Sequence, residues 1–281
     1  MNNLQAINFA NKILKVNKIK SHSLDSELIL AKTLNSTRES LLINLNKKLK
    51  KKKFNKFKKL ILRRKKNEPV AQILKSKEFW KSSFFIDENV LIPRPETEII
   101  IEQFLKFTSK NSTKHILDVG TGSGCIIISI LKERINCYGT ALDISKKAIN
   151  IAKYNAKMHH LHNKINFINI DIDKFNHNKY DFIVSNPPYI NLFNLKRLED
   201  NVKCFEPKLA LQAGIDGFKE INKLILKSSK LLKKNGYLIF EIGDKQKEKT
   251  KDLLKNNGFY INKICKDIRF NPRVIISTKL Y

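Results

Sequence analysis

The sequence predicts a mostly parallel α/β sheet preceded by a small all-α domain, and three observations lead to this fold class. Residues 1–68 contain neither glycine nor proline and repeat their apolar residues every three or four positions, as amphipathic helices do. After Thr113, short apolar runs alternate with helical segments, which is typical of parallel strands joined by crossover helices. Three of the nine glycines lie between the first of these runs and the helix that follows it.

The composition is that of a folded protein with a strongly basic surface. Of the 281 residues, 42% are hydrophobic and 29% are charged, and the net charge of +29 is typical of proteins that meet nucleic acid. No stretch reaches the roughly 20 apolar residues that span a bilayer, so we expect no membrane partner and no secretory signal. The four cysteines lie far apart and form no metal-binding pair, which favours a cytoplasmic location and no metal site.

The helical domain is expected over residues 1–70. Its apolar spacing predicts a bundle of three to five helices, in which Ser23 or Asp25 is a candidate N-cap. Within it, the segment Lys47–Lys66 carries 13 Lys or Arg residues and no acid. The simpler interpretation is a solvated basic face on a packed helix, in a chain that is rich in lysine throughout. The alternative is a nonspecific contact with RNA.

Residues 71–95 are expected to form a hairpin or linker, because EFWKSSFFIDENVLIP mixes aromatic and β-branched residues with turn formers. Pro93 and Pro95 then stiffen a loop ahead of a helix over 96–107. The sheet domain is expected over 96–281.

Seven strands and four further helices are predicted in the sheet domain. The strands are expected at His115–Val119, Tyr138–Leu142, Ile165–Ile170, Tyr180–Ser185, Gly236–Ile242, Phe259–Cys265 and Arg273–Thr278. The helices are expected at Cys125–Arg134, Ser145–His159, Gly217–Lys234 and Lys245–Lys255. The last two strands have no helix between them, so we expect an antiparallel hairpin at one edge of the sheet.

The loop LDVGTGSGC follows the first strand of the sheet domain. Because Gly120, Gly122 and Gly124 carry no side chains, this backbone can approach a ligand closely, at the strand ends where open α/β sheets bind ligands. The alternative is a tight turn, and the spacing departs from the GxGxxG of dinucleotide sites. Asp143, at the end of the second strand, can accept both hydroxyls of a ribose or cap the next helix. Together these features indicate a ligand that contains adenosine.

The fourth strand, Tyr180–Ser185, ends in Asn186-Pro187-Pro188-Tyr189. A stiff turn with a buried tyrosine would explain this tetrapeptide, and so would a chemical reaction. The side-chain oxygen of Asn186 and the backbone carbonyl of Pro187 can accept the two hydrogens of an NH₂ group. Pro188 keeps the turn rigid, and Tyr189 can lie against the planar group.

These motifs resemble those of class I S-adenosylmethionine (AdoMet)-dependent methyltransferases, and the tetrapeptide resembles that of enzymes that methylate planar amide or amino nitrogens. Five further segments are similar to one family, the peptide chain release factor glutamine methyltransferases (PrmC/HemK type). They are EPVAQIL (68–74), EFW (78–80), LIPRPETE (91–98), FEPKLAL (205–211) and AGIDG (213–217). The resemblance is weaker in the helical part, where DSELIL (25–30) is the best match.

The resemblance implies a Rossmann-like methyltransferase fold and methylation of the side-chain nitrogen (N5) of the glutamine in the Gly-Gly-Gln motif of class I release factors. It implies that the helical domain binds the release factor and that AdoMet is the methyl donor. It assigns substrate binding to Asn186–Tyr189 and catalysis to Asn186, Pro187 and Tyr189. The implied AdoMet contacts are Gly120, Thr121, Gly122, Ser123, Gly124, Asp143, Asp171, Ile172 and Asn186.

Some residues have two interpretations. The family has an aromatic residue where this chain has Ile172, which leaves an apolar face to pack on adenine. In RPETE, Glu96 and Thr97 line the cofactor or glutamine pocket or cap the helix N-terminus. A histidine cluster after residue 158 fits solvated or helix-capping side chains better than a metal site, because no cysteine accompanies it.

Two other functions remain open from the residues alone. A nucleic-acid adenine N6-methyltransferase would use the same tetrapeptide on a base flipped out of its stack. A non-catalytic, nucleotide-binding protein would contact RNA through Lys47–Lys66. The choice of glutamine rests on the segments outside the tetrapeptide.

Overall fold

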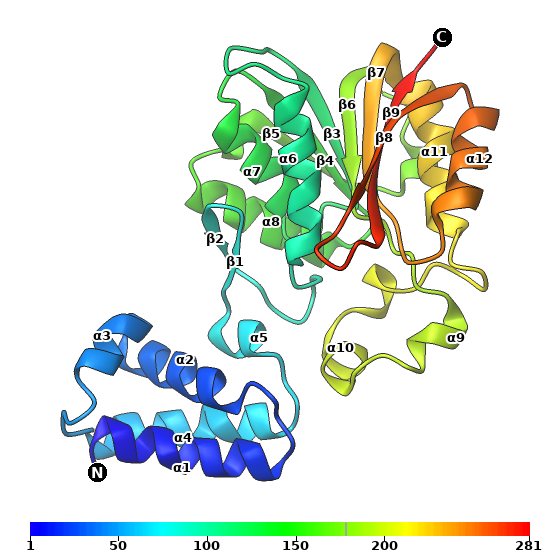
Figure 1. Cartoon of the computed structure of the whole chain (residues 1–281). Helices are drawn as coiled ribbons and strands as arrows, with labels where there is room; N and C mark the ends of the chain where they lie inside the picture. Colours follow the sequence, from blue (N-terminus) through cyan, green and yellow to red (C-terminus); the bar gives the residue numbers. More distant parts are fainter. Residues whose placement is uncertain (178) are drawn as a thin grey trace. The chain divides into compact units, whose positions relative to one another are not determined.

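A computed structural model describes residues 1–177 and 179–281, and the chain divides into two units (Figure 1). The helical unit comprises residues 1–76 together with 199–205, and the sheet unit comprises 77–198 and 206–281. The first boundary between the two units, after residue 76, falls within the segment 71–95. Within the described residues, no helix is long and apolar enough to cross a membrane.

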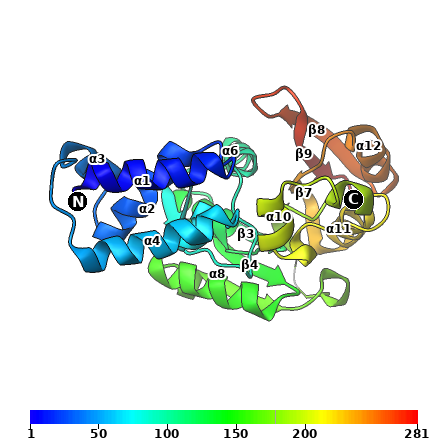
Figure 2. The ribbon, with the colours of Figure 1, turned by 90° about the horizontal axis from the view of Figure 1, so that it is seen from below.

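Six helices form the helical unit, with α1, α2 and α4 packed side by side (Figure 2). They are α1 (Asn3–Val16), α2 (His22–Leu34), α3 (Arg38–Ile43), α4 (Lys51–Lys65), α5 (Val70–Leu74) and α10 (Asp200–Phe205). Asn2 caps α1 in a reciprocal capping box with Gln5, and Thr37 caps α3 through the Ser40 amide. Alanine, isoleucine and leucine side chains at helical spacing fill the core between these helices.

The basic segment Lys47–Lys66 includes helix α4, which packs one face into the core and exposes most of its lysines, as a solvated basic face would. Phe57 and Ile61 of α4 are fully buried, while most of its lysines are exposed. Asp25, expected as an N-cap, instead lies buried inside α2, where its carboxylate takes a 2.7 Å hydrogen bond from Arg64. The reason is that α2 begins earlier than expected, at His22, so that residue 25 falls in its first turn, opposite α4.

The expected hairpin is confirmed at the start of the sheet unit, where β1 (Lys77–Phe79) pairs antiparallel with β2 (Ser82–Phe84). A short 3₁₀ turn, η1 (Pro95–Thr97), then leads into α6 (Glu98–Lys106).

The main sheet has seven strands in the order β5-β4-β3-β6-β7-β9-β8, which confirms the predicted α/β class. Its strands are β3 (His115–Val119), β4 (Tyr138–Asp143), β5 (Ile165–Asn169), β6 (Tyr180–Ser185), β7 (Leu232–Glu241), β8 (Phe259–Lys266) and β9 (Pro272–Lys279). The first five are parallel, and β9 is antiparallel to both of its neighbours, as the hairpin prediction requires.

Helices cover both faces of this sheet, with α6, α7 and α8 on one face and α11 and α12 on the other (Figure 1). Their bounds are α7 (Cys125–Glu133), α8 (Lys146–Met158), α11 (Lys219–Leu231) and α12 (Lys247–Asn256). The short elements are η2 (His162–Lys164), η3 (Ile172–Lys174), α9 (Leu192–Leu195) and η4 (Lys208–Ala210). Helix α11 ends before the predicted Lys234, because Leu232 is drawn into the sheet as the partner of Tyr180.

The chain reverses direction across the sheet between β3 and β6. From β3 it moves outward to β4 and β5, and then returns to place β6 on the other side of β3. Open α/β sheets bind ligands at such a switch point, outside the carboxyl ends of the strands. Both the glycine loop after β3 and the Asn-Pro-Pro-Tyr turn after β6 therefore begin at the switch point.

Replacing Arg64 by methionine is expected to destabilise the helical unit by about 3–5 kcal/mol, because it leaves the Asp25 carboxylate buried without its cation. Hydrogen exchange of the α2 and α4 amides measures the loss. Arg38→Met is the matched control: its ion pair with Glu27 is 2.6 Å long but 41% exposed on the arginine side, so about 0–1 kcal/mol is expected. Equal losses in the two variants would contradict this account.

Candidate functional site

A cleft of about 500 Å³ opens at the switch point, entirely within the sheet unit. Three of its walls lie at strand ends: the glycine loop after β3, residues 143–145 at the end of β4 and Asn186–Pro188 after β6. Residues 170–172 after β5 and Thr97 from η1 complete the part of the cleft considered below. The structure thus brings together residues as far apart in the sequence as Thr97 and Pro188.

Gly120 and Gly122 shape a backbone cradle at the floor of this cleft. Both have positive φ, +70° and +54°, which disfavours residues with a side chain. A Cβ added to Gly120 would meet no atom within 4 Å, and one on Gly122 would meet only the Gly120 carbonyl at 4.0 Å. The missing side chains therefore leave open space, with Thr121 and Ser123 also lining the cleft.

Gly124 has a different reason to be glycine. It does not line the cleft, and a Cβ there would lie 3.0 Å from Ile128 and 3.2 Å from the Ala152 side chain. The absence of a side chain at Gly124 allows close packing of α7 on α8, and its contact with the ligand stays a prediction.

Asp143 closes the cradle from the end of β4. Its carboxylate accepts one hydrogen bond from the Gly122 amide, at 2.9 Å, and one from the Ser145 amide, at 2.8 Å. Burial raises the pKa of this carboxyl above its ordinary value, although the two amides act in the opposite direction. The helix cap itself is the Ser145 hydroxyl, which accepts from the Ala148 amide. Asp143 thus orients the glycine loop and still lines the cleft.

Asp118, two residues before the cradle, is fully buried. One of its carboxylate oxygens accepts a 2.6 Å hydrogen bond from Thr121, and the other has no partner among the described residues. Burial raises the pKa of Asp118 to about 7. A buried carboxyl with one unpaired oxygen is costly, and the Thr121 contact ties it to the loop that lines the cleft.

Asp171 and Ile172 line the cleft beyond β5, and their contact with AdoMet stays a prediction. Asp171 caps the short η3 turn through the Asp173 amide, and Lys223 lies 3.5 Å from its carboxylate. Ile172 is 8% exposed and offers an apolar surface on this wall.

Asn186, Pro187 and Pro188 line the cleft next to the cradle. The Asn186 side-chain amide donates to the Thr97 hydroxyl at 3.0 Å. Among the described residues, neither the Asn186 Oδ1 atom nor the Pro187 carbonyl oxygen receives a hydrogen bond. The turn therefore offers two acceptors beside the cradle, which is the arrangement that fixes a planar NH₂ group.

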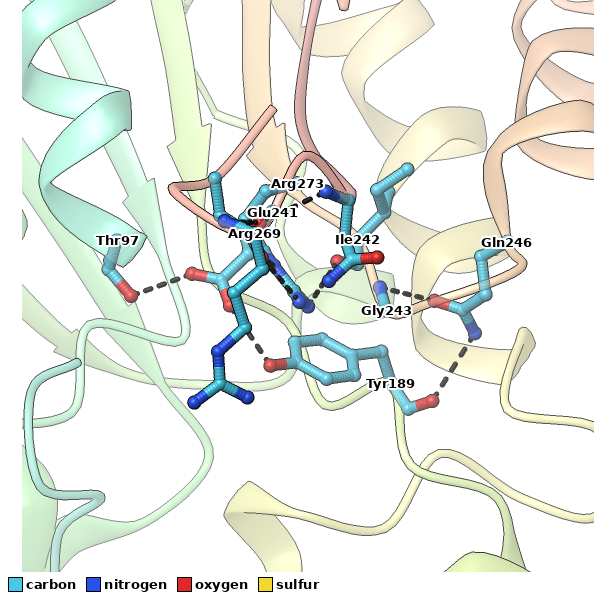
Figure 3. A network of polar contacts seen from close by, with 10 residues as sticks. Thr97, Tyr189, Glu241, Ile242, Gly243, Gln246, Arg269 and Arg273 are labelled. Atoms are coloured by element: carbon cyan, nitrogen blue, oxygen red, sulfur yellow. Dashed lines mark hydrogen bonds and ion pairs between the residues drawn. The ribbon is translucent and has the colours of Figure 1, made fainter. Parts of the chain in front are cut away.

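Tyr189 is partly buried against the core of the sheet unit and does not line the cleft. Its ring packs so closely on Gly243 that a Cβ there would come within 2.8 Å, and its hydroxyl donates to Glu241 at 3.0 Å (Figure 3). Burial raises its pKa well above the ordinary value. In this position Tyr189 packs against Gly243 and Glu241, and its contact with the planar group of a substrate stays a prediction.

Glu241, the last residue of β7, was not among the predicted site residues. It is 1% exposed, and its two carboxylate oxygens accept from Thr97, at 2.6 Å, and from Tyr189. An acid that ends the otherwise apolar run YLIF is a signal that could have revealed it, because the run predicts a buried strand end at the ligand-binding edge. Of the two residues left open in RPETE, Thr97 lines the cleft, and its side chain makes no capping bond.

Two buried side chains fasten the loops around the site. Glu206 accepts from the Ile92 amide, at 3.2 Å, and from Arg94, at 2.5 Å. Gln246 donates to the carbonyls of Tyr189 and Gly217, at 3.2 and 2.9 Å (Figure 3). Glu206 thus bonds the segment 205–211 to the segment 91–98. Gln246 keeps Gly217, at the end of the segment 213–217, next to Tyr189 of the tetrapeptide.

The histidine cluster lies away from the cleft. His159 ends α8 and contacts the Ser83 carbonyl at 3.0 Å. Within residues 1–177 and 179–281, no group of three or more His, Cys, Asp or Glu side chains is arranged to hold a metal ion.

Two family models match the chain. Residues 110–279 match a methyltransferase domain, and residues 5–74 match the PrmC N-terminal domain. The first match includes the glycine loop, the tetrapeptide and Glu241, and the second covers most of α1 and all of α2 to α5 in the helical unit.

Similar proteins include two release factor glutamine methyltransferases. One, from Fusobacterium nucleatum subsp. nucleatum, is 38% identical over 99% of this chain and 79% of its own length. The other, from Clostridium acetobutylicum, is 32% identical over 96% of both chains. A bifunctional methyltransferase from Rickettsia felis is 35% identical over 93% of this chain, which spans about half (55%) of that longer protein.

Solved structures share the fold at low sequence identity. The hMettl16 catalytic domain aligns with a TM-score of 0.56 and 19% identity, over 70% of this chain and 75% of that one. A methyltransferase from Pyrococcus furiosus aligns with a TM-score of 0.54 and 16% identity, over 80% and 98%.

Replacing Asp118 by asparagine is expected to change how stability depends on pH. The folded carboxyl keeps its proton up to about pH 7, whereas the ordinary value is 3.8. Between these values the folded state binds more protons than the unfolded state, so stability falls as the pH rises. Asp118→Asn removes this loss, so its melting temperature relative to the natural protein should be higher at pH 8 than at pH 5. The exposed Asp252→Asn is the control, and an unchanged difference between the two pH values would contradict the assignment.

Proposed function

The chain belongs to the release factor glutamine methyltransferase family, and we propose that it methylates the N5 side-chain nitrogen of the glutamine in the Gly-Gly-Gln motif of class I release factors. The observation that carries the proposal is the pair of acceptors, Asn186 Oδ1 and the Pro187 carbonyl, which belong to residues lining the cleft and receive no hydrogen bond from the described residues. The names of the relatives support glutamine as the planar group.

The cleft fits AdoMet as the methyl donor. The open space over Gly120 and Gly122 admits a ligand against the backbone, and Asp143 can accept from ribose hydroxyls while it orients the loop. Ile172 offers an apolar face for the adenine, and Asp171 lies beside it. When bound, AdoMet supplies a methyl group that is activated by its positively charged sulfur.

Positioning is the main contribution of the protein to this reaction. An amide nitrogen is a poor nucleophile, because its lone pair is delocalised into the carbonyl. Asn186 Oδ1 and the Pro187 carbonyl can hold its two hydrogens, which fixes the plane of the amide and raises the electron density on nitrogen. The nitrogen forms the new N–C bond as the sulfur–methyl bond breaks, and then releases one proton to solvent. Fixed carbonyl dipoles suit a cation whose charge disperses in the transition state.

The helical unit is the proposed contact for the release factor. Its match to the PrmC N-terminal domain supports this role. A nonspecific RNA contact through the exposed lysines of Lys47–Lys66 remains a proposal that rests on charge alone. Translation termination takes place in the cytoplasm, which is therefore the compartment that the proposal implies.

Incubation with AdoMet and a release factor is expected to add one methyl group, seen by mass analysis, to the peptide that contains the Gly-Gly-Gln glutamine. Asn186→Ala should lower the rate by about 100-fold or more, because one of the two acceptors is lost. The exposed Asn194→Ala is the matched control and should keep full activity. Label that enters adenine in nucleic acid, while the release factor stays unmodified, would reject the glutamine assignment.

Asp143→Ala is expected to weaken AdoMet binding selectively. Loss of hydrogen bonds to a charged acceptor removes about 1.5–3 kcal/mol, which is roughly a 10- to 150-fold increase in KM for AdoMet. The KM for the release factor should stay unchanged, and the exposed Asp252→Ala should affect neither value. An increase confined to the KM for the release factor would show that Asp143 is not part of the cofactor site.

A further inference from the structure

A chain of hydrogen bonds runs from a buried carboxylate to the tetrapeptide. The Asn186 amide nitrogen donates to Thr97 Oγ1 at 3.0 Å, and Thr97 Oγ1 donates to Glu241 Oε2 at 2.6 Å. The other Glu241 oxygen accepts from the Tyr189 hydroxyl at 3.0 Å. Figure 3 shows Thr97 and Tyr189 reaching Glu241 from opposite sides.

The direction of these bonds follows from the chemistry of the groups. An ionised carboxylate can only accept, so the single hydroxyl hydrogen of Thr97 points to Glu241. The Thr97 oxygen can then only accept from Asn186, which must present its NH₂ group to it. The Oδ1 atom of Asn186 is thereby turned to the other edge of the amide, and the opposite orientation would place two acceptors against each other.

We propose that Thr97 and Glu241 are positioning residues that hold the Asn186 side chain with its oxygen, and not its NH₂ group, available to the substrate. The inference rests on the proposed function, in which that oxygen accepts from the glutamine amide. A flipped Asn186 would present its own NH₂ group to the NH₂ group of the substrate glutamine. Two donors cannot form a hydrogen bond with each other, so the glutamine amide would lose this contact. The ionised Glu241 also polarises the chain of hydrogen bonds, which strengthens Oδ1 as an acceptor.

The surroundings of Glu241 keep this arrangement rigid. Glu241 and Thr97 are 1% and 2% exposed. Burial raises the pKa of the Glu241 carboxyl, and Glu96 acts in the same direction, whereas Thr97, Tyr189 and the nearby Arg273 lower it.

Arg273 is held in turn by Asp267, at 3.0 Å, and by the Ile242 carbonyl, at 3.3 Å. Burying the carboxylate of Glu241 is costly, and packing alone does not require it. A function in orienting Asn186 therefore explains the presence of Glu241 better than a purely structural role.

Thr97→Val and Thr97→Ser separate orientation from packing. Valine keeps the shape but removes the hydroxyl that directs Asn186, whereas serine keeps the hydroxyl. We expect Thr97→Val to lower kcat for methylation of the release factor by about 100-fold, with the KM for AdoMet unchanged, and Thr97→Ser to stay within a few-fold of the natural enzyme. Similar kcat values for the two variants would overturn the inference.

A second measurement follows the charge of Glu241. Protonated Glu241 can donate to Thr97, which then can donate to Asn186 and flip its amide. The kcat of the natural enzyme should therefore fall as the pH falls through the raised pKa of Glu241. Glu241→Gln has no such group, so its kcat should be low and lack this acid limb. An acid limb that persists in Glu241→Gln would overturn the inference even if Thr97→Val does not fold.

The outcomes also distinguish this inference from the proposed function. If the natural enzyme adds no methyl group to the release factor, the proposed function fails first. If it adds one and the variants behave alike, only the positioning of Asn186 by Thr97 and Glu241 is wrong.

Discussion

One row of residues across three parallel strands determines where the site can form. Val119 of β3 pairs with Ser185 of β6, and Ser185 pairs with Phe240 of β7. The Ser185 hydroxyl reinforces this row by donating to the Val119 carbonyl at 2.7 Å. The next residues along the three strands are Gly120 of the cradle, Asn186 of the tetrapeptide and Glu241. Because a slip of one residue would turn every side chain of a strand to the opposite face, the register fixes the cofactor cradle, the acceptor and its carboxylate relative to one another.

The loops around this row gain their rigidity from side chains elsewhere in the chain. Glu206 fastens the loop that carries Thr97, and Gln246 fastens the Tyr189 carbonyl to the Gly217 loop. Gly217 has no room for a side chain, since a Cβ would lie 2.8 Å from the Tyr189 carbonyl. The sequence segments that carry the family resemblance within the sheet unit are thus largely one contact network around the acceptor, and positioning of this kind is what a weak nucleophile needs.

The strand and helix pattern could be predicted from the sequence because each element has its own apolar periodicity, and the glycines and prolines mark its ends. Tyr180–Ser185 was predicted with the bounds that the structure has. Element ends that depend on residues distant in the sequence were harder to predict. Helix α11 ends before its predicted last residue because Leu232 pairs with Tyr180 in the sheet. In the site, Asp143, Ile172 and Asn186 line the cleft, while Gly124 and Tyr189 do not, and the predicted ligand contacts of all five stay predictions. The positions of Gly124 and Tyr189 depend on packing against α8 and on Glu241, which local sequence does not encode.

The most direct test of the central claim is a crystal structure of the protein with S-adenosylhomocysteine and a Gly-Gly-Gln peptide. We predict that the glutamine amide nitrogen lies about 3 Å from both Asn186 Oδ1 and the Pro187 carbonyl oxygen, with the Asn186 NH₂ group still on Thr97. A glutamine held by other groups, or an Asn186 amide whose NH₂ group faces the peptide, would contradict the account.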